Sequence, residues 1–296
     1  MISIELRRSE KKMQQPLTCV EICAGAGGQA LGLAMAGFVH VALVEYEEDY
    51  CKVLKQNRPE WNVICADVHD FDGRPYHGVD LLAGGVPCPP FSVAGKQLGQ
   101  EDERDLFPEA IRLIKEIQPR AVMLENVRGF LDSGFDEYRD HIFTSIQKLG
   151  YVTHIKLLNA SDYGVPQHRE RLLIVGLQEG TFKFPRPTHG PDSLDDAAFY
   201  NAETALQGVV SKESDESNRL GGRYAPLLDD IPPGLNYSFY TEEMGHPNPI
   251  FAWRSKFSDF LYKADPNTPV RTIKASGGAY TGPLHWENRF FNLEEY

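Results

Sequence analysis

The sequence predicts an α/β fold: a doubly wound, mostly parallel sheet, followed by a second, smaller and irregular domain. Up to about residue 185, short apolar runs alternate with amphipathic stretches, which is the pattern of successive βα units. Several of these runs end in glycine-rich turns. Beyond that point prolines, glycines and polar runs dominate, and the periodicity is weak. We therefore expect a leader over residues 1–16, a first domain over 17–186 and a second domain over 187–296.

The composition is that of a globular protein without a membrane segment. Of the 296 residues, 42% are hydrophobic and 24% are charged, which is ordinary for a soluble domain. No apolar run reaches the length of a membrane span, and the charged start lacks the apolar core of a secretory signal. We expect a cytoplasmic protein with no membrane partner. The net charge of −12 argues mildly against nucleic acid, although local clusters steer binding more than the total does.

The cysteines favour a reducing compartment and no metal site. Their number is odd, and no close pair is matched by a second pair, which argues against a disulfide framework and against structural zinc. Cys19 and Cys65 stand in apolar, strand-like runs, so we expect both in the core. The five cysteines are Cys19, Cys23, Cys51, Cys65 and Cys88.

The first predicted unit is a strand, a glycine turn and a helix. Residues 17–22 form a buried-strand pattern, C-A-G-A-G-G follows over 23–28, and a helix is expected over 29–36. This order opens nucleotide-type α/β domains. The spacing G-x-G-G differs from G-x-G-x-x-G, and no lysine follows as in a phosphate loop. The turn is therefore not tuned for a pyrophosphate, and an ordinary βα loop is the alternative.

Acidic residues end the next two predicted strands. Residues 39–44 predict a strand closed by Glu45 and Tyr46, and 61–65 predict another, followed by Asp67. A carboxylate at the end of the second strand is where such domains bind both ribose hydroxyls. Tyr46 could cover a purine face, and Asp67 could accept a hydrogen bond from an adenine amine. Helix caps or solvated loop ends are the alternative.

A rigid cysteine loop follows the fourth predicted strand, residues 79–83. The segment 84–92 reads G-G-V-P-C-P-P-F-S, so glycines let the backbone turn and prolines stiffen it around Cys88. Open α/β sheets place their ligand sites at this end of their strands. The pattern predicts a nucleophilic cysteine. The polar, glycine-bearing stretch 91–104, with Lys96 and Gln97 near its tip, predicts a lid.

Further candidates stand at the ends of the later strands. A helix is expected over 106–117, and the strand 121–124 runs into Glu125, a carboxylate at the same sheet edge as Cys88. A helix over 135–149 and a strand over 151–158 precede G-V-P-Q-H-R-E-R at 164–171. Arg169 and Arg171 alternate as they enter the strand 172–177, so their side chains share a direction.

Together these segments resemble the DNA cytosine-5 methyltransferase family, of the bacterial modification-methylase type. The match is an ordered set: E-I-C-A-G-A-G-G, V-E-Y, A-D-V, G-G-V-P-C-P-P-F-S, E-N-V, V-P-Q-H-R-E-R and P-V-R-T-I-K-A-S-G-G. It is spread over residues 18–278, and its cysteine loop, E-N-V and Q-x-R-x-R are specific in this order. The resemblance implies the S-adenosylmethionine-dependent methyltransferase fold, with a target-recognition second domain.

The resemblance also assigns roles to single residues. Cys88 matches the nucleophile, and Glu125 matches the glutamate that holds cytosine at N3 and its amine. Arg171 matches the arginine at the base O2, with Arg169 as its companion. The residues expected at the DNA are Ser92, Lys96, Gln97 and Arg271. The residues expected at S-adenosylmethionine are Cys23, Ala24, Gly25, Ala26, Gly28, Glu45, Tyr46, Asp67, Val68, Pro87 and Leu106.

The implied reaction is methyl transfer to C5 of a flipped-out cytosine in double-stranded DNA, with S-adenosylhomocysteine as product and no metal. Attack of the Cys88 thiolate at C6 makes C5 nucleophilic. Glu125 offsets the charge that develops on the ring. The target atoms are inaccessible inside a duplex, so the base must leave the stack. The bacterial type also implies a restriction-modification system.

Two alternatives remain open at this point. A transfer-RNA cytosine-5 methyltransferase shares these motifs but carries a Cys-Phe-Thr signature, which is absent here. A weakly active or inactive DNA-binding subunit, needing a separate C-terminal polypeptide, is the other. It is suggested because the family's last motif, with a Gly-Asn pair, has no match before Tyr296. That reading predicts weakened cofactor affinity and an exposed apolar groove.

Overall fold

The computed structural model describes residues 15–87, 105–210, 218–255, 257–274 and 278–295. The chain forms two compact units. Unit 1 comprises Met1–Leu157 and Leu172–Lys183, and unit 2 comprises Leu158–Arg171 and Phe184–Tyr296. The segment Leu158–Arg171 therefore packs with unit 2, although it precedes the last strand of the sheet. The leader falls almost wholly outside the described residues, and the predicted domain boundaries stay predictions.

Unit 1 is organised by a seven-stranded sheet with the order β3-β2-β1-β4-β5-β8-β6. β1 pairs in parallel with both β2 and β4, and the pairs β2–β3 and β4–β5 are also parallel. The chain reverses its direction across the sheet between β1 and β4, which confirms the predicted doubly wound architecture. The strands are β1 (Leu17–Ile22), β2 (Phe38–Glu45), β3 (Val63–Cys65), β4 (Leu81–Gly85), β5 (Ala121–Val127), β6 (Val152–Asn159) and β8 (Glu170–Leu177).

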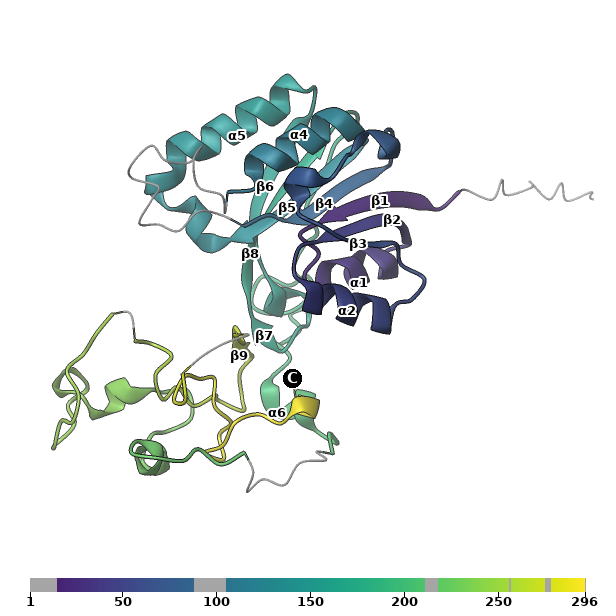
Figure 1. Cartoon of the computed structure of the whole chain (residues 1–296). Coiled ribbons are helices and arrows are strands. Elements are labelled where there is room, and N and C mark those ends of the chain that lie inside the picture. Colours follow the sequence, from purple (N-terminus) through teal and green to yellow (C-terminus); the bar gives the residue numbers. More distant parts are fainter. Residues whose placement is uncertain (1–14, 88–104, 211–217, 256, 275–277, 296) are drawn as a thin grey trace, which may run out of the picture. The chain divides into compact units, whose positions relative to one another are not determined.

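Helices cover both faces of this sheet. Right-handed crossovers on either side of a strand reversal place their helices on opposite faces, and Figure 1 shows α1 and α2 on one face and α4 and α5 on the other. Ligand sites of such sheets lie at the reversal, outside the carboxyl ends of the strands. The helices are α1 (Gly28–Met35), α2 (Glu48–Asn57), α4 (Phe107–Ile117) and α5 (Asp136–Lys148).

The amphipathic pattern of α4 explains how one face of the sheet is buried. Phe107, Ala110, Leu113, Ile114 and Ile117 are all buried, at the i, i+3, i+4 spacing of one helix face. Pro108 occupies the first turn, where its missing N–H costs nothing. These side chains pack in the main core together with Val20 of β1, Leu82 of β4 and Leu124 of β5. No helix in the part of the chain described is long and apolar enough to cross a membrane.

The two cysteines predicted for the core have different environments. Cys19 on the central strand β1 is fully buried, as expected, and burial raises the pKa of its thiol to about 12. Cys65 is exposed, so the prediction for it is wrong. The reason is that β3 is an edge strand of only three residues. An apolar run marks a strand, but an edge strand need not be covered on both faces.

Unit 2 has little regular structure, as its weak periodicity predicts. Two short parallel strands, β7 (Gln167–His168) and β9 (Val270–Arg271), form its sheet. Among its described residues the other regular elements are one short helix, α6 (Ala202–Leu206), and several 3₁₀ turns, and most of the remainder is irregular. Its largest core is aromatic, with Tyr237 and Tyr240 buried together with four leucine side chains and an isoleucine.

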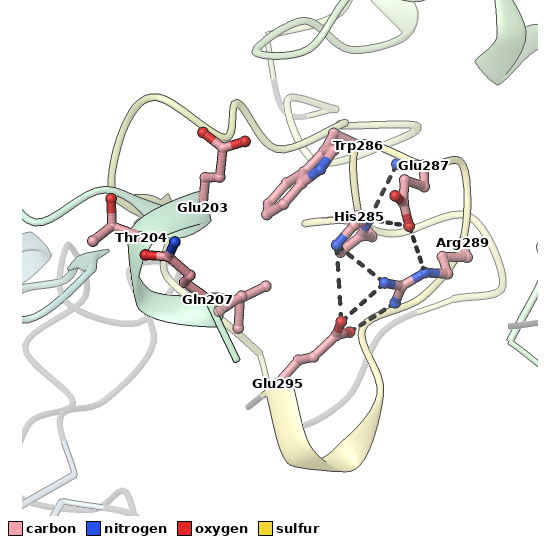
Figure 2. A pocket seen from close by; sticks show the side chains of 9 residues that line it. Glu203, Thr204, Gln207, His285, Trp286, Glu287, Arg289 and Glu295 are labelled. Atoms are coloured by element: carbon pink, nitrogen blue, oxygen red, sulfur yellow. Dashed lines mark hydrogen bonds and ion pairs between the residues drawn. The ribbon is translucent and has the colours of Figure 1, made fainter. Parts of the chain in front are cut away.

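A buried ion-pair network holds the last described residues of unit 2. The Arg289 guanidinium donates to both carboxylate oxygens of Glu295, at 2.7 and 2.9 Å. Arg289 also contacts His285 Nε2 at 3.1 Å and donates from Nε to Glu287 at 3.3 Å (Figure 2). His285 stacks on Trp286 with ring centroids 3.9 Å apart. The network closes one wall of a pocket of about 470 Å³.

Candidate active site

The glycine turn after β1 is held tightly against its neighbours. Gly25 and Gly27 have φ values of 55° and 90°, which glycine adopts without strain, and Cys23 has a φ of 53°, which is uncommon for a residue with a side chain. A Cβ on Gly27 would stand 2.6 Å from Leu54 Cδ2, whereas a Cβ on Gly25 or Gly28 would meet nothing within 4 Å. The turn is therefore packed on its α2 side and open at Gly25 and Gly28, as a ligand cradle requires.

Glu45, at the end of β2, fastens this turn. The side chain is buried, and Oε2 accepts a hydrogen bond from Gly25 N–H at 2.6 Å while Oε1 accepts from Glu47 N–H at 2.9 Å. Each carboxylate oxygen has a second lone pair, so the same group can still accept from two ribose hydroxyls. Glu45 thus has a structural role in the turn, and its contact with the ribose stays a prediction.

The predicted adenine contacts lie just beyond β2 and β3. Asp67 Oδ1 accepts from His69 N–H at 2.9 Å and contacts His69 Nδ1 at 2.6 Å. These hydrogen bonds lower the pKa of Asp67, and the bond from the backbone N–H has the largest effect. Val68 is buried in the main core, so its side chain is committed to packing. Tyr46 is 67% exposed, which leaves its ring accessible for stacking.

Two predicted site residues, Cys23 and Glu125, meet Gly85 at the carboxyl edge of the sheet. Gly85 of β4 pairs in register with Glu125 of β5. A Cβ on Gly85 would lie 3.8 Å from Glu125 Oε2 and 3.8 Å from the carbonyl oxygen of Cys23. β5 continues to Val127, so Glu125 projects from a strand rather than from a loop. The glutamate and the glycine turn therefore face a common point beside β4.

The chain on both sides of the cysteine loop is firmly fixed. Asn126, which is 3% exposed, donates from Nδ2 to the carbonyl of Val86 at 2.9 Å. Asp105 Oδ1 accepts from Phe107 N–H at 3.1 Å, and its Oδ2 accepts from the Tyr138 hydroxyl. Pro87 is exposed and Leu106 is half-buried against the core. Cys88, Ser92, Lys96 and Gln97 lie outside the described residues, so their predicted roles stay predictions.

The predicted arginines belong to unit 2. Arg169 connects β7 to β8, and its backbone N–H donates to Asn159 Oδ1 at 2.9 Å. Arg171 Nη1 donates to the carbonyl of Glu170 at 2.7 Å. Arg271 pairs with His168 across β7 and β9, and its guanidinium lies 3.9 Å from the Tyr262 ring centroid. The predicted catalytic residues are thus distributed over both units.

A model of the family described as C-5 cytosine-specific DNA methylase matches residues 17–263. The chain belongs to this family. The type II methyltransferase M.NgoMIV of Neisseria gonorrhoeae is 63% identical over 173 residues, which are 57% of this chain and 55% of the relative. M.SacI of Streptomyces achromogenes is 31% identical over 311 residues, and the match covers 93% of this chain and 79% of the relative. The chain spans about half the length of M.NgoMIV and of M.NaeI, since the matches cover 55% and 44% of these relatives.

Solved structures of methyltransferases share the fold of this chain. A protein described as a DNA modification methyltransferase encoded within an E. coli prophage superposes with a TM-score of 0.62 at 21% identity, over 94% of this chain and 86% of that one. A mutant of Spodoptera frugiperda DNMT2 superposes with 0.58 at 19% identity, over 78% and 72%. At these identities the likeness concerns the fold, and it confirms the predicted methyltransferase architecture.

Cys23, the described cysteine beside the candidate site, is no alternative nucleophile. Burial, followed by the charges of Glu45, Asp67 and Glu21, raises the pKa of Cys23 to about 12. A nucleophilic cysteine must reach the thiolate form near neutral pH. Cys23 remains a thiol there, which fits its position inside the glycine turn. Among the described residues no cluster of three or more His, Cys, Asp or Glu side chains could hold a metal ion.

Asn126 supports the candidate site, and the sequence did not single it out. Its hydrogen bond to Val86 links the end of β5 to the residue two before Cys88. The Asp105–Tyr138 hydrogen bond, which fixes the chain after the loop, was not expected either. The available signal was the position of Asn126 directly after Glu125. A side chain that reaches across to a neighbouring strand leaves no periodic trace in the sequence.

Proposed function

We propose that this protein transfers a methyl group from S-adenosylmethionine to C5 of cytosine in double-stranded DNA, as the modification enzyme of a type II system. The observation that carries the proposal is the meeting of Glu125, Gly85 and the Cys23 carbonyl beside β4, in a chain of the cytosine-specific family. This point lies at the strand reversal of the sheet, where a doubly wound fold takes its ligand. It joins a cofactor side, the glycine turn, to a base side, Glu125.

The glycine turn fits the methyl donor. Gly25 and Gly28 leave open space, and a sulfonium with its methionine backbone can approach the turn closely at these two residues, which lack Cβ atoms. Glu45 would bind the ribose hydroxyls with the lone pairs that Gly25 and Glu47 leave over. Tyr46 would stack on the adenine, whose edge would face Asp67. When bound, S-adenosylmethionine supplies the methyl group.

The chemistry on the base side would be carried by Cys88 and Glu125. The Cys88 thiolate bonds to C6 of the flipped cytosine, and the electron pair moves to C5, which then takes the methyl group. A hydrogen bond from Glu125 at N3 offsets the charge developing on the ring. Loss of the C5 proton returns the electron pair, breaks the bond to sulfur and restores the thiolate. Arg169 and Arg171 would orient the base and its phosphate.

Trapping of the covalent adduct tests this proposal. The chain is incubated with S-adenosylmethionine and a long PCR product containing 5-fluorocytosine, which cannot lose fluorine from C5. We expect a denaturation-resistant protein–DNA complex with wild-type protein and none with Cys88→Ser. Glu125→Gln should form it about 10²-fold more slowly. Cys65→Ser serves as the matched control, because Cys65 is exposed on an edge strand, and it should behave like the wild type.

Other outcomes would replace the proposal. An adduct with transfer RNA but not with DNA would identify an RNA cytosine-5 methyltransferase. Binding of DNA without any adduct would favour a DNA-binding subunit. Adduct formation by Cys88→Ser would contradict the assignment of the nucleophile.

A further inference from the structure

Unit 2 exposes three large apolar side chains within eight residues. Ile250, Trp253 and Phe257 are 53%, 56% and 46% exposed. Single exposed apolar residues are common, but a group of them on one segment marks an interaction site. Tryptophan in particular is enriched where binding energy concentrates. The segment 250–257 therefore has the character of a contact surface.

An aromatic pocket lies against this segment. It has a volume of about 360 Å³, which lies within the range of small-ligand sites. Its walls are rings packed edge to face: Tyr224 and Phe251 each meet Phe260 at close to a right angle, with centroids 5.4 and 5.8 Å apart. The lining residues are Tyr224, Tyr237, Ile250, Phe251, Ala252, Arg254, Phe257 and Phe260.

Hydrogen bonds hold the rim of this aromatic pocket in place. The Tyr237 hydroxyl accepts from Arg254 N–H at 2.7 Å and donates to the Arg254 carbonyl at 2.9 Å. The backbone of Arg254, the residue after the exposed Trp253, is thereby tied on both of its sides to a buried wall residue. The pocket is thus pre-formed, and a ligand need not order this part of the chain to bind there.

The charge around the aromatic pocket is positive. The Arg254 guanidinium lies 5.3 Å from the Phe257 ring centroid, and that of Arg223 lies 5.2 Å from the Tyr224 ring. No carboxylate is among the lining residues. In contrast, Glu203, Glu287 and Glu295 line the pocket beside Arg289 (Figure 2). The aromatic pocket, unlike the pocket beside Arg289, therefore suits a ligand that is flat, apolar and attached to an anion.

We propose that the aromatic pocket binds an unstacked nucleobase of the DNA substrate, with Arg254 pairing to the adjoining phosphate. The inference rests on the proposed function for the identity of the polymer. Aromatic faces beside a cation are the elements by which proteins bind unstacked bases. The bound base is distinct from the target cytosine, because none of the residues assigned to that cytosine, Glu125, Arg169 and Arg171, lines the aromatic pocket.

Two labelled 12-mers that differ only in their bases test the proposal with the full chain. One is oligo(dT) and the other is an abasic strand with the same phosphates, and binding is followed by fluorescence anisotropy. We expect wild-type protein to prefer oligo(dT) about tenfold. Phe257→Ala and Trp253→Ala should each remove most of this preference. Leu194→Ala is the matched control, since Leu194 is a 66% exposed apolar residue of the same unit.

A positional readout accompanies the affinities. A strand with 5-iodouracil, cross-linked by light, should attach to the peptide containing residues 250–260 in wild-type protein and in Leu194→Ala. Equal binding of both strands by the wild type, or a preference that survives Phe257→Ala and Trp253→Ala, would overturn the proposal and favour a protein partner for this surface. A covalent adduct at Cys88 without the base preference would overturn this inference alone, whereas the preference without the adduct would overturn only the proposed function.

Discussion

Unit 1 and unit 2 stabilise their loops by different means. In unit 1 a hydrogen-bonded sheet positions the turns, and single carboxylates such as Glu45 then fasten them through backbone N–H groups. In the described part of unit 2, the paired strands β7 and β9 have two residues each. Loops there are held by edge-to-face contacts between aromatic rings and by buried charged side chains such as Arg289. Unit 1 should therefore be most sensitive to backbone geometry, and unit 2 to individual side chains.

Among the substitutions that test this comparison, the largest loss of stability is expected at Gly84, in the centre of the sheet. A Cβ there would stand 2.6 Å from Ile22 Cγ1 and 3.0 Å from the Ile22 carbonyl oxygen. Since β1 and β4 cannot separate without breaking their pairing, Gly84→Ala should lower the free energy of unfolding by about 3 kcal/mol. Urea denaturation measures it. Gly32→Ala in α1, where a Cβ meets nothing within 4 Å, should stabilise by about 0.5–1 kcal/mol, and equal losses in both variants would refute the steric explanation.

The corresponding change in unit 2 removes a charge. Glu295 and Arg289 are both buried, and breaking one partner of a buried pair leaves the other uncompensated. Glu295→Gln should therefore destabilise by about 2–3 kcal/mol. Glu294→Gln, on the exposed neighbour, should change stability by less than about 0.5 kcal/mol. A loss in both variants would mean that the terminal turn, and not the ion pair, is what matters.

This pair also predicts an acid response. Burial opposes ionisation of Glu295, but the hydrogen bonds from Arg289 and from Asn292 N–H outweigh it and lower its pKa in the folded state. A lowered folded-state pKa gives stability above the unfolded-state value that is lost as pH falls through the folded-state value. The difference between wild type and Glu295→Gln should thus be full at pH 7 and shrink below about pH 4. A difference that stays constant with pH would exclude an ionised Glu295.

A smaller effect is expected when the fastening of the glycine turn is weakened. Glu45→Gln keeps the size of the side chain but replaces one acceptor oxygen by an amide, leaving either Gly25 or Glu47 N–H unpaired. The cost of about 1–2 kcal/mol should fall on the turn, so calorimetric titration should give about tenfold weaker binding of S-adenosylmethionine. Glu47→Gln is the control, because it makes the same substitution on an exposed side chain and keeps the backbone N–H that Glu45 accepts from. This variant should bind S-adenosylmethionine like the wild type.

The same contrast explains how far the sequence could be used. The strands and helices of unit 1 follow the predicted runs within a few residues, because burial on a sheet imposes a period that can be read directly. Glu45 and Glu125 were predicted because parallel strands bring their carboxyl ends to one edge. The hydrogen bonds Asn126–Val86 and Asp105–Tyr138 were not predicted. Each is a single hydrogen bond between residues that are 33 or more positions apart in the sequence.

Unit 2 shows the other limit. The rings that build its aromatic pocket stand at irregular spacings between Tyr224 and Phe260, so the sequence indicates many aromatics but not that they enclose a cavity. Arg289 and Glu295 are six residues apart on an irregular segment, where no helical face brings them together. Prediction fails here because edge-to-face packing and buried ion pairs depend on tertiary geometry, which carries no local period.

Thiol labelling tests this difference between strand pattern and burial on the smallest scale. Cys65 is exposed although it lies in an apolar run of the sequence. The thiols of Cys19, Cys23 and Cys51 have pKa values raised to about 12, and burial is the largest cause in each case. Iodoacetamide reacts with accessible thiolates, so brief alkylation of folded Cys88→Ser protein at pH 8 should modify Cys65 and spare the other three. Peptide mass spectrometry gives the ratio, and labelling in urea provides the reference for full exposure. Fast modification of Cys23 would instead mean that the glycine turn opens in solution, and that Glu45 does not hold it.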